Sequence, residues 1–269
     1  MKVKFSKPNI EKKDTQKVVN ILKSGWLTHG KFTNLFEQQF KKFTRCKYAV
    51  AVSSCTAGLH LTCLSIGLQK GDEVIVPSQT HTATAHAVEY TGAKVIFSDV
   101  EQLTGNISIN DLKKKITKKT KAIIVVHMAG YPCDMDTIVK ICKKNNILLI
   151  EDCAHALGTK IKNKHMGNYG VAGCFSFYPT KQITTGEGGM VITNNKNIFK
   201  KIKTLKAFGI DKDINKRKKP GAYDVKFLGF NYRMTDFQAC LGYFQLKKFN
   251  IYLKKRQIIA KKYHSALSK

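Results

Sequence analysis

The chain has 269 residues, of which 43% are hydrophobic, so it can form a large packed core and is not a wholly disordered chain. It carries 47 Lys and Arg against 18 Asp and Glu, which gives a net charge of +29. Because the lysines are spread along every segment and form no single stripe with aromatic residues, we interpret the charge as compositional and expect no nucleic-acid partner, although a basic nucleic-acid-binding protein is an alternative.

Two helices, a strand and a turn of small residues are predicted at the start of the chain. Apolar residues recur at helical spacing in Ile10–Lys23, and Asn34–Phe43 is a short amphipathic stretch. Tyr48–Val52 indicates a strand, and Ser53–Gly58 turns it into a helix that runs to about Ile66. Small residues at such a turn leave backbone amides available for an anion such as phosphate, although an ordinary capped helix has the same pattern.

The middle of the chain alternates strands with helices. The predicted strands are Glu73–Val76, Lys94–Phe97, Ala122–Val126 and Ile147–Ile150, and the helices between them are Thr82–Tyr90, Asn110–Thr117 and Met135–Lys144. Repeated units of this kind predict an α/β fold with a mostly parallel sheet and helices on both faces. Ligands of such sheets bind at the carboxyl ends of the strands, and His81, His127, Asp152 and His155 fall at or just beyond those ends.

A glycine-rich loop around Lys181 comes next. Phe175–Met190 contains a short apolar run, a proline break, one lysine, a glycine cluster and the start of a second apolar run, which predicts strand, tight loop and strand. Three hydroxyl groups lie nearby in sequence, on Ser176, Thr180 and Thr184. Glycines let the backbone approach a bound group, and a lysine positioned in this way suits Schiff-base chemistry. A solvated loop lysine is the alternative interpretation.

Asp152 follows a continuous apolar strand, so we expect its carboxylate to be partly buried and to need a partner. That partner is either a structural Lys or Arg, or the protonated ring nitrogen of a cofactor such as pyridoxal phosphate, whose enzymes combine such an acid with a Schiff-base lysine. The histidines at the strand ends include no closely spaced pair of metal ligands, so no metal site is predicted.

The last part of the chain adds a strand at Met190–Thr193 and helices at Asn197–Phe208, Thr235–Phe249 and Ile251–Leu267. The densest basic run, Lys216–Lys219, could steer an anionic substrate. Eight scattered cysteines without a C-x-x-C pair are typical of reduced thiols in a cytoplasmic protein. The N-terminus lacks the apolar core of a signal peptide, and no apolar run approaches the length of a membrane span.

Six stretches together resemble the DegT/DnrJ/EryC1/StrS family. They are Ser54–Ala57, Pro77–Thr84, His127–Asp136, Glu151–Gly158, Ser176–Met190 and Asn231–Met234, in the family's order and spacing over nearly the whole chain. Members of this family are fold-type I, pyridoxal-phosphate-dependent aminotransferases that act on keto sugars attached to nucleotides. The resemblance implies a large cofactor-binding domain at residues 1–250, with a mostly parallel, seven-stranded type of sheet between helices. It leaves only the start of a truncated C-terminal small domain at residues 251–269.

The resemblance also implies roles for four residues around the cofactor ring. Lys181 is similar to the lysine that forms the Schiff base with pyridoxal phosphate, and Asp152 to the acid that keeps the pyridine nitrogen protonated. His81 stands where an aromatic ring stacks on the cofactor. His155 stands at a position, commonly glutamine, near the oxygen on the ring.

Four further residues correspond to the cofactor's phosphate site. Thr56, Ala57 and Ser176 resemble the family's phosphate cradle. Asn231 resembles the asparagine that each subunit contributes to the phosphate site of its neighbour. The resemblance therefore implies a homodimer with shared active sites.

By the same resemblance, the reaction moves an amino group from a donor, glutamate, to a nucleotide-linked keto sugar in polysaccharide or cell-surface sugar biosynthesis. One subgroup of the family has histidine in place of the lysine and performs dehydration, so Lys181 favours amino transfer. A pyridoxal-phosphate-dependent sugar dehydratase and an inactive truncated relative are the alternatives.

Overall fold

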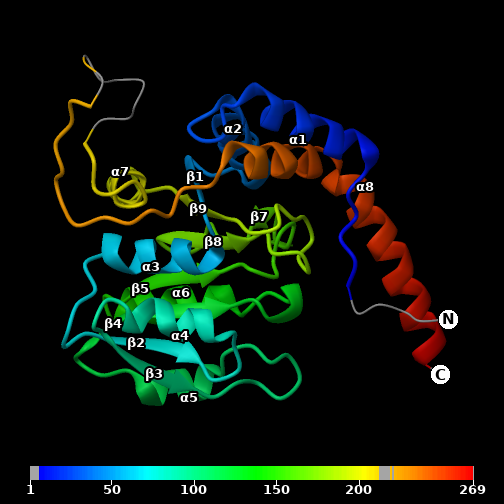
Figure 1. Cartoon of the computed structure of the whole chain (residues 1–269). Coiled ribbons are helices and arrows are strands. Elements are labelled where there is room, and N and C mark those ends of the chain that lie inside the picture. The colour runs from blue at the N-terminus through cyan, green and yellow to red at the C-terminus, as the bar shows by residue number, and fades with distance from the viewer. Residues whose placement is uncertain (1–5, 212–218, 220, 269) are drawn as a thin grey trace.

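A seven-stranded sheet forms the centre of the structure (Figure 1). The computed structural model describes residues 6–211, 219 and 221–268. In spatial order, the strands are β1 (Tyr48–Val52), β9 (Gly189–Thr193), β8 (Ala172–Ser176), β5 (Leu148–Asp152), β4 (Thr120–Val126), β2 (Glu73–Pro77) and β3 (Lys94–Ser98). Neighbours are parallel except at β9, which runs antiparallel to both β1 and β8. The predicted mostly parallel sheet is thereby confirmed.

Helices cover both faces of the sheet. They are α1 (Lys12–Ser24), α2 (Lys31–Thr44), α3 (Cys55–Ser65), α4 (Thr82–Glu89), α5 (Ile109–Lys115), α6 (Met135–Lys144), α7 (Lys196–Leu205) and α8 (Asp236–Leu267). Apolar side chains of α2, α5, α6 and α8 pack on one face, and those of α3, α4 and α7 pack on the other. Strands β4, β5, β8 and β9 are almost wholly buried between these layers, which explains their continuous apolar sequences.

Two small elements were not expected from the sequence. They are the 3-10 helix η1 (Met128–Gly130) and a hairpin of β6 (Lys160–Ile161) and β7 (Lys164–His165). Both are too short to leave a periodic pattern of apolar residues. Both lie in segments that follow a strand of the sheet, η1 after β4 and the hairpin after β5.

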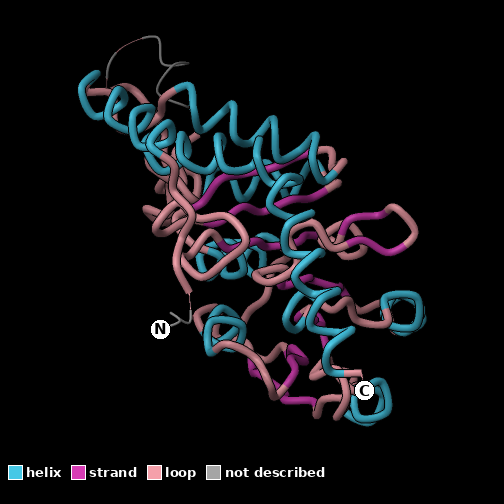
Figure 2. The backbone as a smooth tube through the Cα atoms, turned by 90° about the vertical axis from the view of Figure 1, so that its right-hand side faces the viewer, coloured by secondary structure: helices cyan, strands magenta, loops and turns pink. Residues whose placement is uncertain are grey.

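The two helices predicted at the C-terminal end are one helix, α8. Thr235 and Gln238 form a capping box at its start, and no glycine or proline follows Gly242 up to Ser268, so nothing in the sequence interrupts it. Figure 2, drawn from the side on which α8 lies, shows the helix continuing to the C-terminus. The predicted domain boundary at residue 250 falls inside α8, and the division into two domains stays a prediction.

Among the described residues, no helix combines the length and the apolar composition that crossing a bilayer requires. All eight cysteines are buried and free. Of the basic run Lys216–Lys219, all but Lys219 lies outside the described residues.

Candidate active site

Asp152, the last residue of β5, is buried at the carboxyl edge of the sheet, with 4% of its surface exposed. The hydroxyl of Thr84 on α4 donates to its Oδ2 at 2.8 Å, and the amide of Ala154 donates to its Oδ1 at 3.0 Å. Donors of this kind stabilise the charged carboxylate and fix its orientation. Among the described residues, no Lys or Arg forms an ion pair with Asp152, so a structural ion pair does not account for its burial.

Lys181 lies in the loop between β8 and β9. The loop is closed by hydrogen bonds from the Phe177 amide to the Gly188 carbonyl and from the Thr185 amide to the Phe177 carbonyl, both 2.9 Å. The hydroxyl of Thr184 also donates to the Phe177 carbonyl at 2.9 Å. This hydroxyl, one of the three that lie near Lys181 in the sequence, therefore helps to close the loop.

Lys181 is half-buried, and its amine lies close enough to Asp152 for the carboxylate charge to act on it. Burial lowers the pKa of Lys181, while the charge of Asp152 partly opposes this shift. A lowered pKa increases the fraction of neutral amine, which is the form that reacts with a carbonyl group.

Two histidines border the same pair of groups. The pKa of His155 is lowered by its burial and by the positive charges of Lys181 and His81, against the opposing charge of Asp152. Because these groups are close enough for their charges to act on one another, Lys181, Asp152, His155 and His81 form one cluster. The buried Nδ1 of His155 has no hydrogen-bond partner among the described residues, and a buried polar atom of this kind needs one. His81 is exposed, and its Nδ1 accepts the Ala83 amide at 3.1 Å as the N-cap of α4.

The N-terminus of α3 lies next to the strand ends that carry Ser176. Gly189 pairs with Val52 on one side and with Ser176 on the other, so Ser176 and the start of α3 lie at the same edge. A Cβ at Gly189 would lie 2.5 Å from the Ser54 carbonyl oxygen, so only glycine permits this approach. The side chain of Ser54, the N-cap of α3, accepts the Ala57 amide at 3.0 Å, and Cys55 and Thr56 are the first two residues of the helix, where amides lack intrahelical acceptors.

Asn231 is exposed. Its Oδ1 accepts from Arg233 Nε at 3.0 Å, and its backbone pairs with Ala207 in an isolated bridge. Within the part of the chain that the structure describes, no hydrogen bond joins it to Lys181 or Asp152.

A second cluster, His127, Glu151 and Cys153, lies within metal-binding distance but is already satisfied by protein contacts. His127 Nδ1 accepts the Cys133 amide at 3.2 Å, so its Nε2 carries the proton that faces Glu151 Oε2 at 3.3 Å. Backbone amides of Gly167, Tyr169 and Gly170 donate to the Glu151 carboxylate at 2.6–2.7 Å. These hydrogen bonds tie neighbouring segments of the chain together, so we assign the cluster a structural role.

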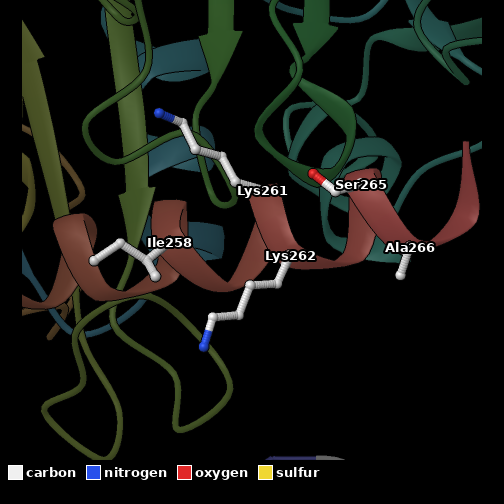
Figure 3. A pocket seen from close by; sticks show the side chains of 5 residues that line it. All are labelled: Ile258, Lys261, Lys262, Ser265 and Ala266. Carbon is white, nitrogen blue, oxygen red and sulfur yellow. The ribbon is translucent and has the colours of Figure 1, made fainter.

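A hollow on the second half of α8 contains none of the predicted site residues. Figure 3 shows its lining side chains, Ile258, Lys261, Lys262, Ser265 and Ala266. All five come from one helix, and the two lysines point in different directions. This hollow lacks the convergent polar groups of a ligand site.

Sequence analysis missed two residues that contact Asp152. Thr84 is fully buried and holds Oδ2, while Cys55 Sγ lies 3.9 Å from Oδ1. Burial and the charge of Asp152 raise the pKa of the Cys55 thiol well above its usual range, so it is protonated. Both residues fall within motifs that carried the resemblance, but their contacts with Asp152 depend on how α3 and α4 pack on the sheet.

The cluster fits pyridoxal phosphate. It offers an amine with a lowered pKa at Lys181, a buried carboxylate at Asp152 and a buried polar atom without a partner at His155. The N-terminus of α3 beside Ser176 offers an anion site. These groups match an aldehyde, a ring nitrogen, a ring oxygen and a phosphate.

Comparison with known proteins places this chain among sugar aminotransferases. The model of the DegT/DnrJ/EryC1/StrS aminotransferase family matches residues 8–269. An uncharacterized protein of Methanocaldococcus jannaschii is 44% identical over 261 residues, which cover 96% of this chain and 68% of that protein. GDP-perosamine synthase of Escherichia coli O157:H7 is 40% identical over 254 residues, covering 94% of this chain and 68% of the enzyme.

Solved structures of aminotransferases are also similar to this chain. A putative sugar aminotransferase from Streptococcus pneumoniae, in its PMP form, superposes with a TM-score of 0.93 at 31% identity, covering 98% of this chain and 72% of that one. The Helicobacter pylori aminotransferase PseC, involved in the biosynthesis of pseudoaminic acid, superposes with a TM-score of 0.91 at 33% identity, covering 98% and 70%. An aminotransferase from Psychrobacter cryohalolentis superposes with a TM-score of 0.86 at 37% identity, and this chain covers 63% of its length.

Proposed function

The chain belongs to the DegT/DnrJ/EryC1/StrS aminotransferase family, and on this premise we propose that it uses pyridoxal phosphate to transfer an amino group to a keto sugar attached to a nucleotide. The observation that carries the proposal is the cluster of Lys181, whose burial lowers the pKa of its amine, with the buried carboxylate of Asp152. This pair supplies the two groups that amino transfer on pyridoxal phosphate requires.

Bound pyridoxal phosphate supplies an electron sink for the carbon that gains or loses a proton. Lys181 Nζ would hold the cofactor and, when released as a free amine, would carry that proton. The Asp152 carboxylate, oriented by Thr84 and Ala154, would hold the proton on the ring nitrogen. His155 Nδ1 would contact the ring oxygen, which gives this buried atom its partner.

The remaining predicted residues would hold the cofactor in place. Thr56, Ala57 and Ser176 would bind its phosphate at the start of α3, where backbone amides and the helix dipole favour an anion. His81 would stack on the ring from the N-cap position of α4.

We propose a nucleotide-linked keto sugar as amino acceptor and glutamate as donor. The acceptor class is supported by the similarity to GDP-perosamine synthase and to PseC. The glutamate donor follows from the family resemblance alone. Free thiols at all eight cysteines support a cytoplasmic location as a further prediction.

We further propose a dimer in which Asn231 reaches the phosphate site of the other subunit. Its exposed side chain is accessible to a second subunit, which supports this assignment. Mixing Lys181→Ala with Asn231→Ala protein should restore activity, because one site of each mixed dimer then carries neither change. Sedimentation at several concentrations would separate a lost dimer from a wrong assignment of Asn231.

The central experiment is borohydride reduction of the protein with pyridoxal phosphate, followed by peptide mapping. We expect the pyridoxyl group on Lys181, none in Lys181→Ala protein, and an unchanged yield in the matched control Lys160→Ala, since Lys160 is exposed on β6. An adduct on a different lysine, or no adduct at saturation, would refute the proposal. Products from a panel of nucleotide-linked keto sugars, identified by mass spectrometry, would then define the acceptor.

A further inference from the structure

Three polar side chains of α8, far apart along the helix, each bond to one backbone group of the loop that carries Lys181. The bonds run from Gln238 Nε2 to the Glu187 carbonyl (2.9 Å), from the Thr184 amide to Gln245 Oε1 (3.0 Å) and from Arg256 Nη2 to the Gln182 carbonyl (3.0 Å). Their order along α8 is the reverse of the order of their partners in the loop. The helix and the loop therefore run antiparallel along a shared contact.

The spacing of the three side chains puts them on one face of α8. Gln245 and Arg256 follow Gln238 by 7 and 18 residues, which at 3.6 residues per turn are about two and five full turns. The same face contains Gly242, where a Cβ would lie 2.9 Å from the Thr185 side chain. This glycine lets the helix approach the loop closely enough for the hydrogen bonds on either side of it.

The same face also contacts the segment that follows Asp152. A Cβ at Gly158 would lie 2.7 Å from the ring of Phe249, so this ring packs directly on the backbone there. The side-chain amide of Gln182 donates to the carbonyl of His155, which links this segment to the lysine loop. One helix face thus contacts the segment that follows Asp152 and the loop that carries Lys181.

Hydrogen bonds within the loop that carries Lys181 do not by themselves fix the backbone at Gln182 and Thr184. The amides of Phe177 and Thr185 close the ends of the loop within the loop itself. The Gln182 carbonyl accepts from Arg256 and the Thr184 amide donates to Gln245, one and three residues after Lys181. These two bonds to α8 restrict the course of the loop after Lys181 and therefore where its amine can lie.

We propose that α8 positions Lys181, with Gln245 and Arg256 as the positioning residues. This inference builds on the proposed function, because it assigns what holds the reacting amine. Arg256 lies on the exposed second half of α8, so its replacement tests the anchor without disturbing the core. Gln245 is buried, and its Nε2 also donates to the Asn9 carbonyl at 3.2 Å, so its replacement tests the loop and the N-terminal segment together.

The test compares Arg256→Met and Gln245→Met with wild-type protein and with the matched control Lys254→Met, which removes the same charge from an exposed neighbour on α8. All measurements use protein without cofactor, so they remain decisive if no pyridoxal phosphate binds. Hydrogen exchange should become about fivefold faster in the peptide that contains residues 182–187, the factor expected for the loss of one hydrogen bond. Arg256→Lys, which keeps a donor on a long stem, should restore part of the protection.

The second readout is the pH profile of acetylation at Lys181. Burial lowers the pKa of Lys181, so a released loop should move the midpoint of this profile upward in both Met variants and leave it unchanged in Lys254→Met. Wild-type exchange rates in Arg256→Met would overturn the proposal. Faster exchange with an unmoved Lys181 profile would overturn it as well, because α8 would then hold the loop without positioning the amine.

Discussion

Replacing Glu151 with glutamine should strongly destabilise the protein, although the two side chains have nearly the same shape. Glu151 is fully buried and accepts four hydrogen bonds, two on each carboxylate oxygen. An amide group turns one of these oxygens into a donor that faces two other donors. The favoured orientation places the new NH₂ toward Gly167 and His127, because the opposite orientation loses the two short bonds from Tyr169 and Gly170.

The size of the effect follows from these contacts. A hydrogen bond to a charged group contributes about 1.5–3 kcal/mol, so two lost bonds amount to about 3–6 kcal/mol. The relief of a buried charge offsets part of this loss, so we expect a result near the lower end. For a domain of this size, about 3 kcal/mol corresponds to a Tm lower by roughly 6–12 °C.

Thermal unfolding followed by circular dichroism would measure the effect, with Glu101→Gln as the matched control. Glu101 is exposed, so the same substitution there should change the stability by no more than about 0.5 kcal/mol. If Glu151→Gln melted within 2 °C of wild type, at about the resolution of such an experiment, the four-donor account of this carboxylate would be wrong.

Three further predictions concern the cluster around the lysine. Thr84→Val removes a bond to a charged, buried carboxylate and should lower the free energy of unfolding by about 1.5–3 kcal/mol; an unchanged urea midpoint would contradict this. Burial lowers the pKa of His155, so the unfolded chain binds more protons, and stability should fall as the pH drops below about 6.5. His155→Gln should lose less stability than wild type between pH 7 and pH 5, and an equal loss would argue against a neutral, buried His155. Asp152→Asn should reduce kcat more than it raises KM in steady-state assays, because the charge that Asp152 stabilises develops in the transition state; a normal kcat would assign the ring proton to another group.

The strands of the seven-stranded sheet and most of the helices could be predicted from the sequence, as could the two central residues of the proposed site. Buried strands leave continuous apolar runs, and Asp152 is separated from the end of such a run only by Glu151, where the carboxyl edge of a parallel sheet must lie. The loop of Lys181 could be recognised because proline and glycine interrupt two apolar runs. These signals are local, so they do not depend on how the elements pack.

The groups that surround those two residues could not be predicted from local sequence, because they come from distant parts of the chain. Thr84 and Asp152 are 68 positions apart, and the hydroxyl reaches the carboxylate because α4 and β5 belong to the same layered arrangement, with apolar residues of both in one core cluster. The contacts of α8 with the lysine loop likewise join residues that are 51 to 74 positions apart. Periodicity tells which face of a helix is apolar, but the partner of a polar side chain on that face depends on the order of the strands and the course of the loops. The long-range hydrogen bonds that orient Asp152 and anchor the loop of Lys181 therefore follow from the fold and leave no local pattern in the sequence.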